Sequence, residues 1–220
     1  MATDDALVTC TDTALTFGRD ARAVVAVHGA NLTIRPGERL AIVGSSGSGK
    51  SSLLHLIAGL ERATTGSVTR APGLEPGDIG LVFQNDSLIP ALNVAENAAL
   101  PLILADRPEN EARETALAAL ARVGVRHLAD RLPEEISGGQ AQRVAVARVL
   151  SQAPRLILAD EPTGRLDHAS GARVLDALLT TADLARAALV VTTHDPSVAA
   201  RLAQRRTMRD GRLLAPEETS

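Results

Sequence analysis

One stretch of the sequence has the residue types and spacing of a phosphate-binding loop. Gly44-Ser-Ser-Gly-Ser-Gly-Lys50-Ser51 fits the pattern G-x-x-x-x-G-K-[ST]. Its glycines let successive backbone N–H groups point into one concavity, and Lys50 places an ammonium against the terminal phosphates. Ser51 supplies a hydroxyl for Mg²⁺. The residues expected to contact the phosphates are Gly44, Ser45, Ser46, Gly47, Ser48, Gly49, Lys50, Ser51 and Ser52.

A Gly/Ser-rich linker is the other interpretation of this stretch. The flanking sequence argues against a linker, because an apolar strand precedes Gly44 and a short buried helix follows Lys50, as a phosphate loop requires. Lys50 is also the only lysine among the 23 Lys and Arg residues. The one lysine therefore occupies the position where the compact charge of an ammonium suits a phosphate and a planar guanidinium would fit badly.

Two carboxylates follow a second apolar strand, residues 155–159. Sheets of parallel strands bind ligands at the carboxyl ends of those strands. We therefore expect Asp160 to hold Mg²⁺, directly or through water, and Glu161 to act as the general base that polarises an attacking water. A strand that simply ends in a charged turn is the alternative, which the phosphate loop elsewhere in the chain disfavours.

Two more polar side chains end predicted strands. His194 closes the strand at residues 187–193, where it would donate to the terminal phosphate or hold the base and the water. Gln84 follows the strand at residues 78–83, where its amide would ligate Mg²⁺ and orient water. The predicted catalytic residues are thus Lys50, Gln84, Glu161 and His194, and the predicted metal ligands are Ser51, Gln84 and Asp160.

A second helix start also has the features of a phosphate site. Ser137-Gly-Gly-Gln140 precedes a long predicted helix and combines a serine cap with two glycines. A nucleotide held between two opposed copies would use the loop of one chain and this helix start of the other, which a symmetric pair satisfies at both sites. The predicted contacts here are Ser137, Gly138, Gly139 and Gln140.

Together these motifs resemble those of the ATP-binding cassette ATPases. The family's motifs occur in its own order as a Walker A loop (44–51), a Q-loop (Gln84), a signature (136–140), a Walker B end (Asp160 and Glu161), a D-loop (164–167) and a switch histidine (His194).

The resemblance implies ATP and Mg²⁺ as cofactors, a second ATPase subunit that would be an identical copy, and a separate transmembrane permease. It places Phe17 where the family stacks adenine on an aromatic ring, and Asp167 of the D-loop among the nucleotide contacts. An ordinary core position in a strand is the alternative for Phe17. Phe83, directly before Gln84, is expected to be core.

Within the family, residues 88–97, 160–167 and 208–212 resemble the lipoprotein-release and macrolide-export subgroup. Its ATPases pair with permeases that have few membrane helices and a large extracytoplasmic domain. The departures from the subgroup are Ile136 for leucine in the signature, Arg165 for asparagine in the D-loop, and a short segment between residues 66 and 84. Arg165 is expected near the dimer seam, where it puts the D-loop contacts in question.

The elements around these residues alternate between strand and helix. Such alternation builds a mostly parallel sheet covered on both faces, so the predicted class is α/β, of the P-loop NTPase type. It would carry an antiparallel β subdomain and a helical subdomain that holds the signature. We expect one nucleotide-binding domain over residues 1–220, with the core and β subdomain at about 1–84 and 154–220 and the helical subdomain at about 85–153.

Composition narrows the classes of partner. The net charge of −3 and pI of about 6.0 give no basic field, so no nucleic-acid partner is expected. Cys10 is the only cysteine, which excludes an intrachain disulfide and favours a reducing compartment. The sequence shows neither a secretory signal nor an apolar run near the ~20 residues of a membrane helix. The expected location is therefore peripheral, at the cytoplasmic face of the membrane through the permease.

The predicted function is an ATP-binding and ATP-hydrolysing transporter subunit that dimerises on ATP and drives export, lipoprotein release or mechanotransmission. The alternative is a soluble ATP-gated clamp in DNA repair, translation or regulation, which the lack of a coiled-coil insert, a second cassette and a basic face disfavours. A third possibility is an inactive partner in a heterodimer. The presence of Lys50, Asp160, Glu161 and His194 argues against it, although Arg165 keeps it open.

Overall fold

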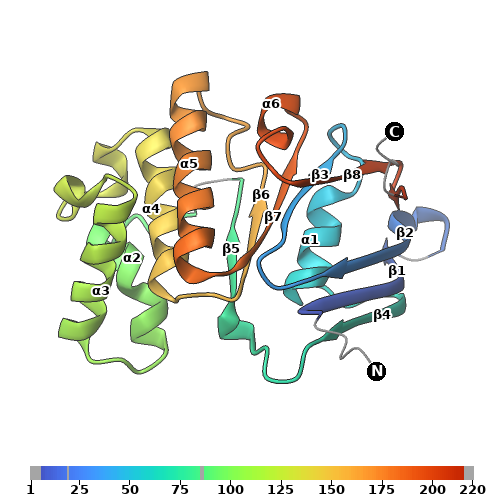
Figure 1. Ribbon diagram of the computed structural model, residues 1–220, viewed down its shortest axis with the longest axis horizontal. Coiled ribbons are helices and arrows are strands. Elements are labelled where there is room, and N and C mark those ends of the chain that lie inside the picture. Colours follow the sequence, from blue (N-terminus) through green and yellow to red (C-terminus); the bar gives the residue numbers. More distant parts are fainter. Residues whose placement is uncertain (1–5, 19, 85–86, 216–220) are drawn as a thin grey trace.

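The computed structural model describes residues 6–18, 20–84 and 87–215 and arranges their strands in two sheets (Figure 1). A three-stranded antiparallel sheet has the order β2-β1-β4, and a six-stranded sheet has the order β5-β6-β7-β3-β8-β9. The strands are β1 (Val8–Phe17), β2 (Val24–Ile34), β3 (Arg39–Val43), β4 (Thr65–Arg70), β5 (Ile79–Val82), β6 (Leu156–Asp160), β7 (Ala188–Thr193), β8 (Gln204–Arg209) and β9 (Arg212–Leu213).

The large sheet is parallel from β5 to β8, and only β9 pairs in the antiparallel sense. Its central strands are apolar on both faces. In β6, Leu156 and Leu158 pack into one buried cluster and Ile157 and Ala159 into another, and every residue of the strand is buried. A strand covered on both sides shows no alternation of polar and apolar residues, and this explains the continuous apolar run at residues 156–159.

Helix α1 (Lys50–Ala58) lies between the two sheets, where Figure 1 shows it in cyan. Its side chains Leu53, Leu54, Leu56 and Ile57 are at most 1% exposed and belong to the cluster shared by β1, β2, β3, β6 and β7. Burial on both sides fixes the axis of α1. The loop before α1 therefore has a fixed position at the edge of the large sheet.

The remaining helices cover the opposite face of the large sheet and extend away from it (Figure 1). Helix α2 begins with a capping box in which Asn93 and Glu96 exchange hydrogen bonds, and α4 begins with the same arrangement of Ser137 and Gln140. These helices are α2 (Val94–Leu104), α3 (Glu109–Arg122), α4 (Gly138–Ser151), α5 (His168–Ala185) and the short α6 (Pro196–Ala199).

This architecture confirms the α/β class, the antiparallel β unit and the helical unit formed by α2, α3 and α4. The predicted boundaries of the units stay predictions, and residues 85–86, where the helical unit was expected to begin, lie outside the described residues.

One expectation is wrong: Phe83 follows the end of β5 and is 36% exposed, so it is not a core residue. Among the described helices, none combines the length and apolarity needed to cross a bilayer.

Candidate functional site

At two glycines of the loop between β3 and α1, Gly44 and Gly49, a side chain would collide with neighbouring backbone. Gly49 has φ +98° and packs so closely on the Ala26 carbonyl that a Cβ would strike it. A Cβ on Gly44 would strike the Met208 carbonyl in the same way. Gly47, at φ +76°, instead faces open space. The loop therefore packs against β2 and β8 on one side, while its backbone at Gly47 is open to the other side.

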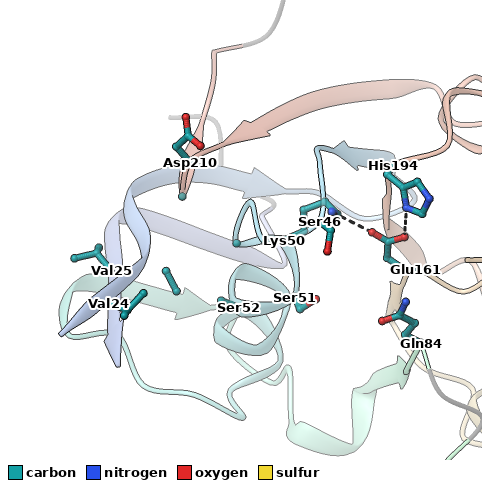
Figure 2. A pocket seen from close by; sticks show the side chains of 14 residues that line it. Val24, Val25, Ser46, Lys50, Ser51, Ser52, Gln84, Glu161, His194 and Asp210 are labelled. Carbon is teal, nitrogen blue, oxygen red and sulfur yellow. Dashed lines mark hydrogen bonds and ion pairs between the residues drawn. The ribbon is translucent and has the colours of Figure 1, made fainter. Parts of the chain in front are cut away.

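Lys50 is the first residue of α1, and its side chain is only 4% exposed. The ammonium donates to the carbonyl oxygens of Gly44 and Ser45, at 2.9 Å each. It also pairs with Glu161 Oε1 at 3.0 Å, as Figure 2 shows. These contacts hold the positive charge inside the curve of the loop.

Glu161 directly follows β6 and adopts φ +44°, which turns its side chain toward the loop. Its backbone N–H donates to both the carbonyl and the hydroxyl of Thr192 on β7, at 3.1 Å each. The carboxylate is bracketed by two partners, with Lys50 on Oε1 and His194 Nδ1 2.5 Å from Oε2 (Figure 2). The ends of β3, β6 and β7 therefore converge on one carboxylate.

Strand register explains this convergence. Asp160 pairs with Thr192 across β6 and β7, and Val43 pairs with Thr193 across β3 and β7, so the three strands end at the same level. Thr192 is fully buried and donates its hydroxyl to Asp160 Oδ1 at 2.6 Å. One threonine thus holds both the carboxylate of Asp160 and the backbone of Glu161.

Lys50, Glu161 and His194 border a cavity of about 520 Å³. Figure 2 shows Lys50, Ser46, His194 and Glu161 toward one end, Gln84 beside Glu161, and Val24 and Val25 at the other end. Its lining residues are Val24, Val25, Ala26, Ser46, Gly47, Gly49, Lys50, Ser51, Ser52, Gln84, Glu161, His194, Asp210 and Gly211.

The structure brings all four predicted catalytic residues to this cavity, together with Ser46, Gly47, Gly49, Ser51 and Ser52. Gly44, Ser45 and Ser48 support the loop from behind and do not line the cavity. Asp160 lies one residue before Glu161, is 7% exposed and also stays behind the lining. The roles of these residues remain predictions.

Phe17 does not line the cavity either. It ends β1 opposite Val24 and is 44% exposed, so the alternative of a core position is wrong. Val24 and Val25, which reach the cavity from β2, and Asp210 and Gly211, from the turn after β8, were not predicted. Nothing in the residue types of these four marks them as binding residues. Only the approach of β2 and of the β8–β9 turn to the loop brings them there.

The second predicted phosphate site lies elsewhere. Ser137 and Gly138, at the start of α4, are exposed and do not line this cavity, and Gly138 and Gly139 lie beside Leu166. Asp167 caps α5, and the hydrogen bonds from Ser170 hold the pKa of its carboxyl below the ordinary value. Within one chain, Ser137, Gly138, Gly139, Gln140 and Asp167 are therefore separate from Lys50 and Glu161.

The donor groups near the loop are oxygen-rich and suit a hard cation. Ser51 and Gln84 border the same cavity, and Asp160 has one carboxylate oxygen held by Thr192. Hydroxyl, amide and carboxylate oxygens, completed by water, are the donors that Mg²⁺ takes. In the described ranges, no three His, Cys, Asp or Glu side chains cluster as metal ligands.

Comparison with known proteins gives a consistent result. A family model described as ABC transporter matches residues 27–164. The lipoprotein-releasing system ATP-binding protein LolD of Shewanella denitrificans is 42% identical over 205 residues, which cover 88% of each chain. The LolD of Pseudomonas fluorescens is 38% identical and covers 96% of this chain and 99% of its own.

Solved structures agree with these relatives. A dimeric post-hydrolysis state of the ATP-binding cassette MJ0796, bound to ADP and Pi, is 34% identical to this chain. It superposes with a TM-score of 0.85 and covers 96% of this chain and 97% of its own. A bacterial ABC transporter cassette of the same protein, also dimeric, matches equally well.

Thr192 gives a test of how Asp160 and the Glu161 backbone are held. Replacing Thr192 by Val removes the donor to Asp160 and one acceptor of the Glu161 N–H, and leaves a buried carboxylate short of a partner. We expect the free energy of unfolding in urea to fall by about 1–3 kcal/mol. Thr193→Val is the matched control, because Thr193 is also buried but only accepts from the Asp195 N–H. Equal losses in both variants would show that the bond to Asp160 does not matter.

Proposed function

The chain belongs to the ABC transporter family as an ATP-binding and ATP-hydrolysing subunit, and from this premise we propose that it works as one half of a dimer that drives a separate membrane permease. The observation that carries the proposal is the bracketing of Glu161 by Lys50 and His194 at the end of the cavity. This contact brings a cation suited to phosphate, a carboxylate suited to act as general base, and a histidine into one hydrogen-bonded cluster.

The cavity suits a nucleotide laid along the loop. Its phosphates would follow the free backbone at Gly47 to the start of α1, where the helix dipole adds positive charge and Lys50 supplies an ammonium. The adenine ring of the nucleotide would lie toward Val24 and Val25, with Phe17 on the neighbouring strand at the rim of the cavity. The terminal phosphate would then lie beside Glu161.

In this arrangement Glu161 accepts the proton of the attacking water. His194 is bonded to Glu161 Oε2, so it fixes the direction in which the carboxylate points and can also donate to the terminal phosphate. Lys50 neutralises the charge on the phosphates and stands 3.0 Å from Glu161 Oε1. Ser51, Gln84 and Asp160 would hold Mg²⁺, which supplies charge neutralisation on the phosphate oxygens.

A second copy of the chain would complete the site. Ser137 and Gly138 are exposed at the start of a 14-residue helix and do not line the chain's own cavity. Opposed copies would bring Ser137, Gly138, Gly139 and Gln140 of one chain to the nucleotide of the other, with Asp167 and Arg165 near the seam. The dimeric structures of MJ0796 support this arrangement.

The permease we propose is of the lipoprotein-release type, and it would hold this subunit at the cytoplasmic face of the membrane. Support comes from the relatives in Shewanella and Pseudomonas that bear that name and match nearly their full length. Arg165 in the D-loop still departs from that subgroup. For this reason we propose the type of permease and not the substrate that it transports.

Glu161→Gln is the experiment that tests the catalytic assignment. The amide keeps the shape of the side chain but cannot accept a proton, so we expect turnover to fall by about 10²–10⁴-fold. ATP binding should persist, and the ATP-bound dimer should accumulate in sedimentation velocity runs. Glu111→Gln, an exposed change on α3, is the control and should leave turnover unchanged. Undiminished turnover of Glu161→Gln would remove the base assignment.

The permease is tested by purification from membranes. Tagged full-length protein, extracted in mild detergent, should be recovered with a polytopic membrane protein that has a large extracytoplasmic domain. The same preparation at physiological salt should contain neither ribosomes nor DNA. Recovery with either of these, and without a membrane protein, would favour the ATP-gated clamp over transport.

A further inference from the structure

Arg165 stands on a short turn that connects Glu161 to helix α5. The N–H of Gly164 donates to the carbonyl oxygen of Glu161 at 3.1 Å, which fixes the start of the turn. Asp167 ends the turn by capping α5, where its side chain accepts from the N–H of Ser170 at 3.0 Å. Arg165 itself is exposed. The turn therefore holds the backbone of Arg165 in place and leaves its side chain accessible.

The residue before Arg165 packs on the catalytic groups of its own chain. A Cβ on Gly164 would lie 3.3 Å from Oε2 of Glu161 and 3.7 Å from Nε2 of Gln84. Arg165 does not line the cavity that those two side chains border. The arginine is thus carried by a turn that touches the site, yet it lies outside the chain's own cavity.

The residue after Arg165 packs on the start of α4. A Cβ on Gly138 or on Gly139 would lie 3.9 or 4.0 Å from Cδ2 of Leu166, which is ordinary van der Waals contact. Ser137, the cap of α4, is exposed as Arg165 is. The turn and the helix start therefore form one continuous surface of the chain.

Other arginines lie near the same helix start. Arg173 of α5 donates to the hydroxyl of Ser170 at 3.0 Å, and a Cβ on Gly139 would lie 3.0 Å from the Cβ of Ser170. Arg143 of α4 donates to the carbonyl oxygen of Gly139 at 3.3 Å. Burial, and then repulsion by Arg173, hold the pKa of Arg143 below its ordinary value. Arg165 thus adds a further positive charge near this helix start, which suits the approach of a phosphate.

We infer that Arg165 is a catalytic residue that acts across the dimer: its guanidinium binds the terminal phosphate of the nucleotide held by the other chain. The inference deepens the proposed function and rests on it, because it requires both the opposed dimer and its ATP. In that dimer the start of α4 meets the other chain's nucleotide, and Arg165 shares its surface. Charge develops on the phosphate oxygens during hydrolysis, and the planar fork of a guanidinium binds such oxygens in pairs. The asparagine of the resembled subgroup has no charge to offer at this position.

Replacing Arg165 by Ala in the full-length protein tests the catalytic role. We expect kcat to fall by about a hundredfold, because the phosphate loses one of its cations while Lys50 remains. Arg165→Lys keeps the charge but not the fork, and it should lose about tenfold. Arg122→Ala is the matched control, since Arg122 is also an exposed arginine, in the last turn of α3, and turnover should not change. A kcat for Arg165→Ala equal to that of Arg122→Ala would overturn the inference.

Mixing two variants decides whether Arg165 serves the other chain. A trace of Arg165→Ala is mixed with an excess of Glu161→Gln, so that nearly every Arg165→Ala chain pairs with a Glu161→Gln chain. The mixed dimer then holds one complete site, with Glu161 from the first chain and Arg165 from the second. We expect turnover at least about tenfold above that of Arg165→Ala alone, approaching that of a trace of wild type in the same excess. An arginine that served its own chain would give no such rise, and this result would overturn the inference.

A dimerisation measurement decides the matter if the reference mixture with wild type is itself inactive. In the Glu161→Gln background, Arg165→Ala should weaken the ATP-bound dimer by about tenfold in sedimentation equilibrium. The affinity of the monomer for ATP should stay the same, because Arg165 contacts only the nucleotide of the other chain. An unchanged dimer constant, or an equal loss of ATP affinity in the monomer, would overturn the inference.

Failure of the inference can be told from failure of the proposed function. A wild-type protein that neither hydrolyses ATP nor dimerises with it would refute the proposed function, and the inference with it. A wild type that does both, together with an Arg165→Ala variant that equals it in turnover, overturns the inference alone. Urea unfolding of Arg165→Ala should match that of the wild type, since the side chain is exposed.

Discussion

The hydrogen-bonded cluster of Lys50, Glu161 and His194 is the interaction on which the rest of the structure depends. Lys50 and Glu161 are 4% and 10% exposed, and a charge so enclosed is costly unless it is paired and hydrogen-bonded. The cluster meets this requirement only if three strand ends stay in register to within one residue. The parallel pairing of β3, β6 and β7 provides that register, and the double burial of the sheet makes a slip expensive.

The same constraint explains the surroundings of the cluster. Helix α1 is fixed between two sheets, so its first residue, Lys50, has one position relative to the end of β6. Glycines allow the loop to lie against β2 and β8, and Thr192 of β7 holds the Asp160 carboxylate and the Glu161 backbone. On the other face, α4 begins at the exposed residues Ser137 and Gly138. A single chain thus holds the loop, the two carboxylates and this helix start in fixed positions.

Much of this could be predicted from the sequence because the signals are local. The loop at 44–51, the carboxylates after an apolar strand and the capped helix at Ser137 each depend on neighbouring residues alone. The role of Thr192 could not be predicted, since it follows from the pairing of Asp160 with Thr192 across two strands. The exposure of Phe83 and the approach of Val24 to the cavity likewise depend on how distant elements pack.

Selective modification of Lys50 tests the central claim most directly, because the chain has no other lysine. An amine-directed reagent can react only there and at the N-terminal amine, and mass spectrometry distinguishes the two products. The account predicts that saturating ATP slows modification of Lys50, and that protein modified there loses ATP binding while remaining folded. Protein fully modified at Lys50 that still binds ATP as tightly as before would contradict it.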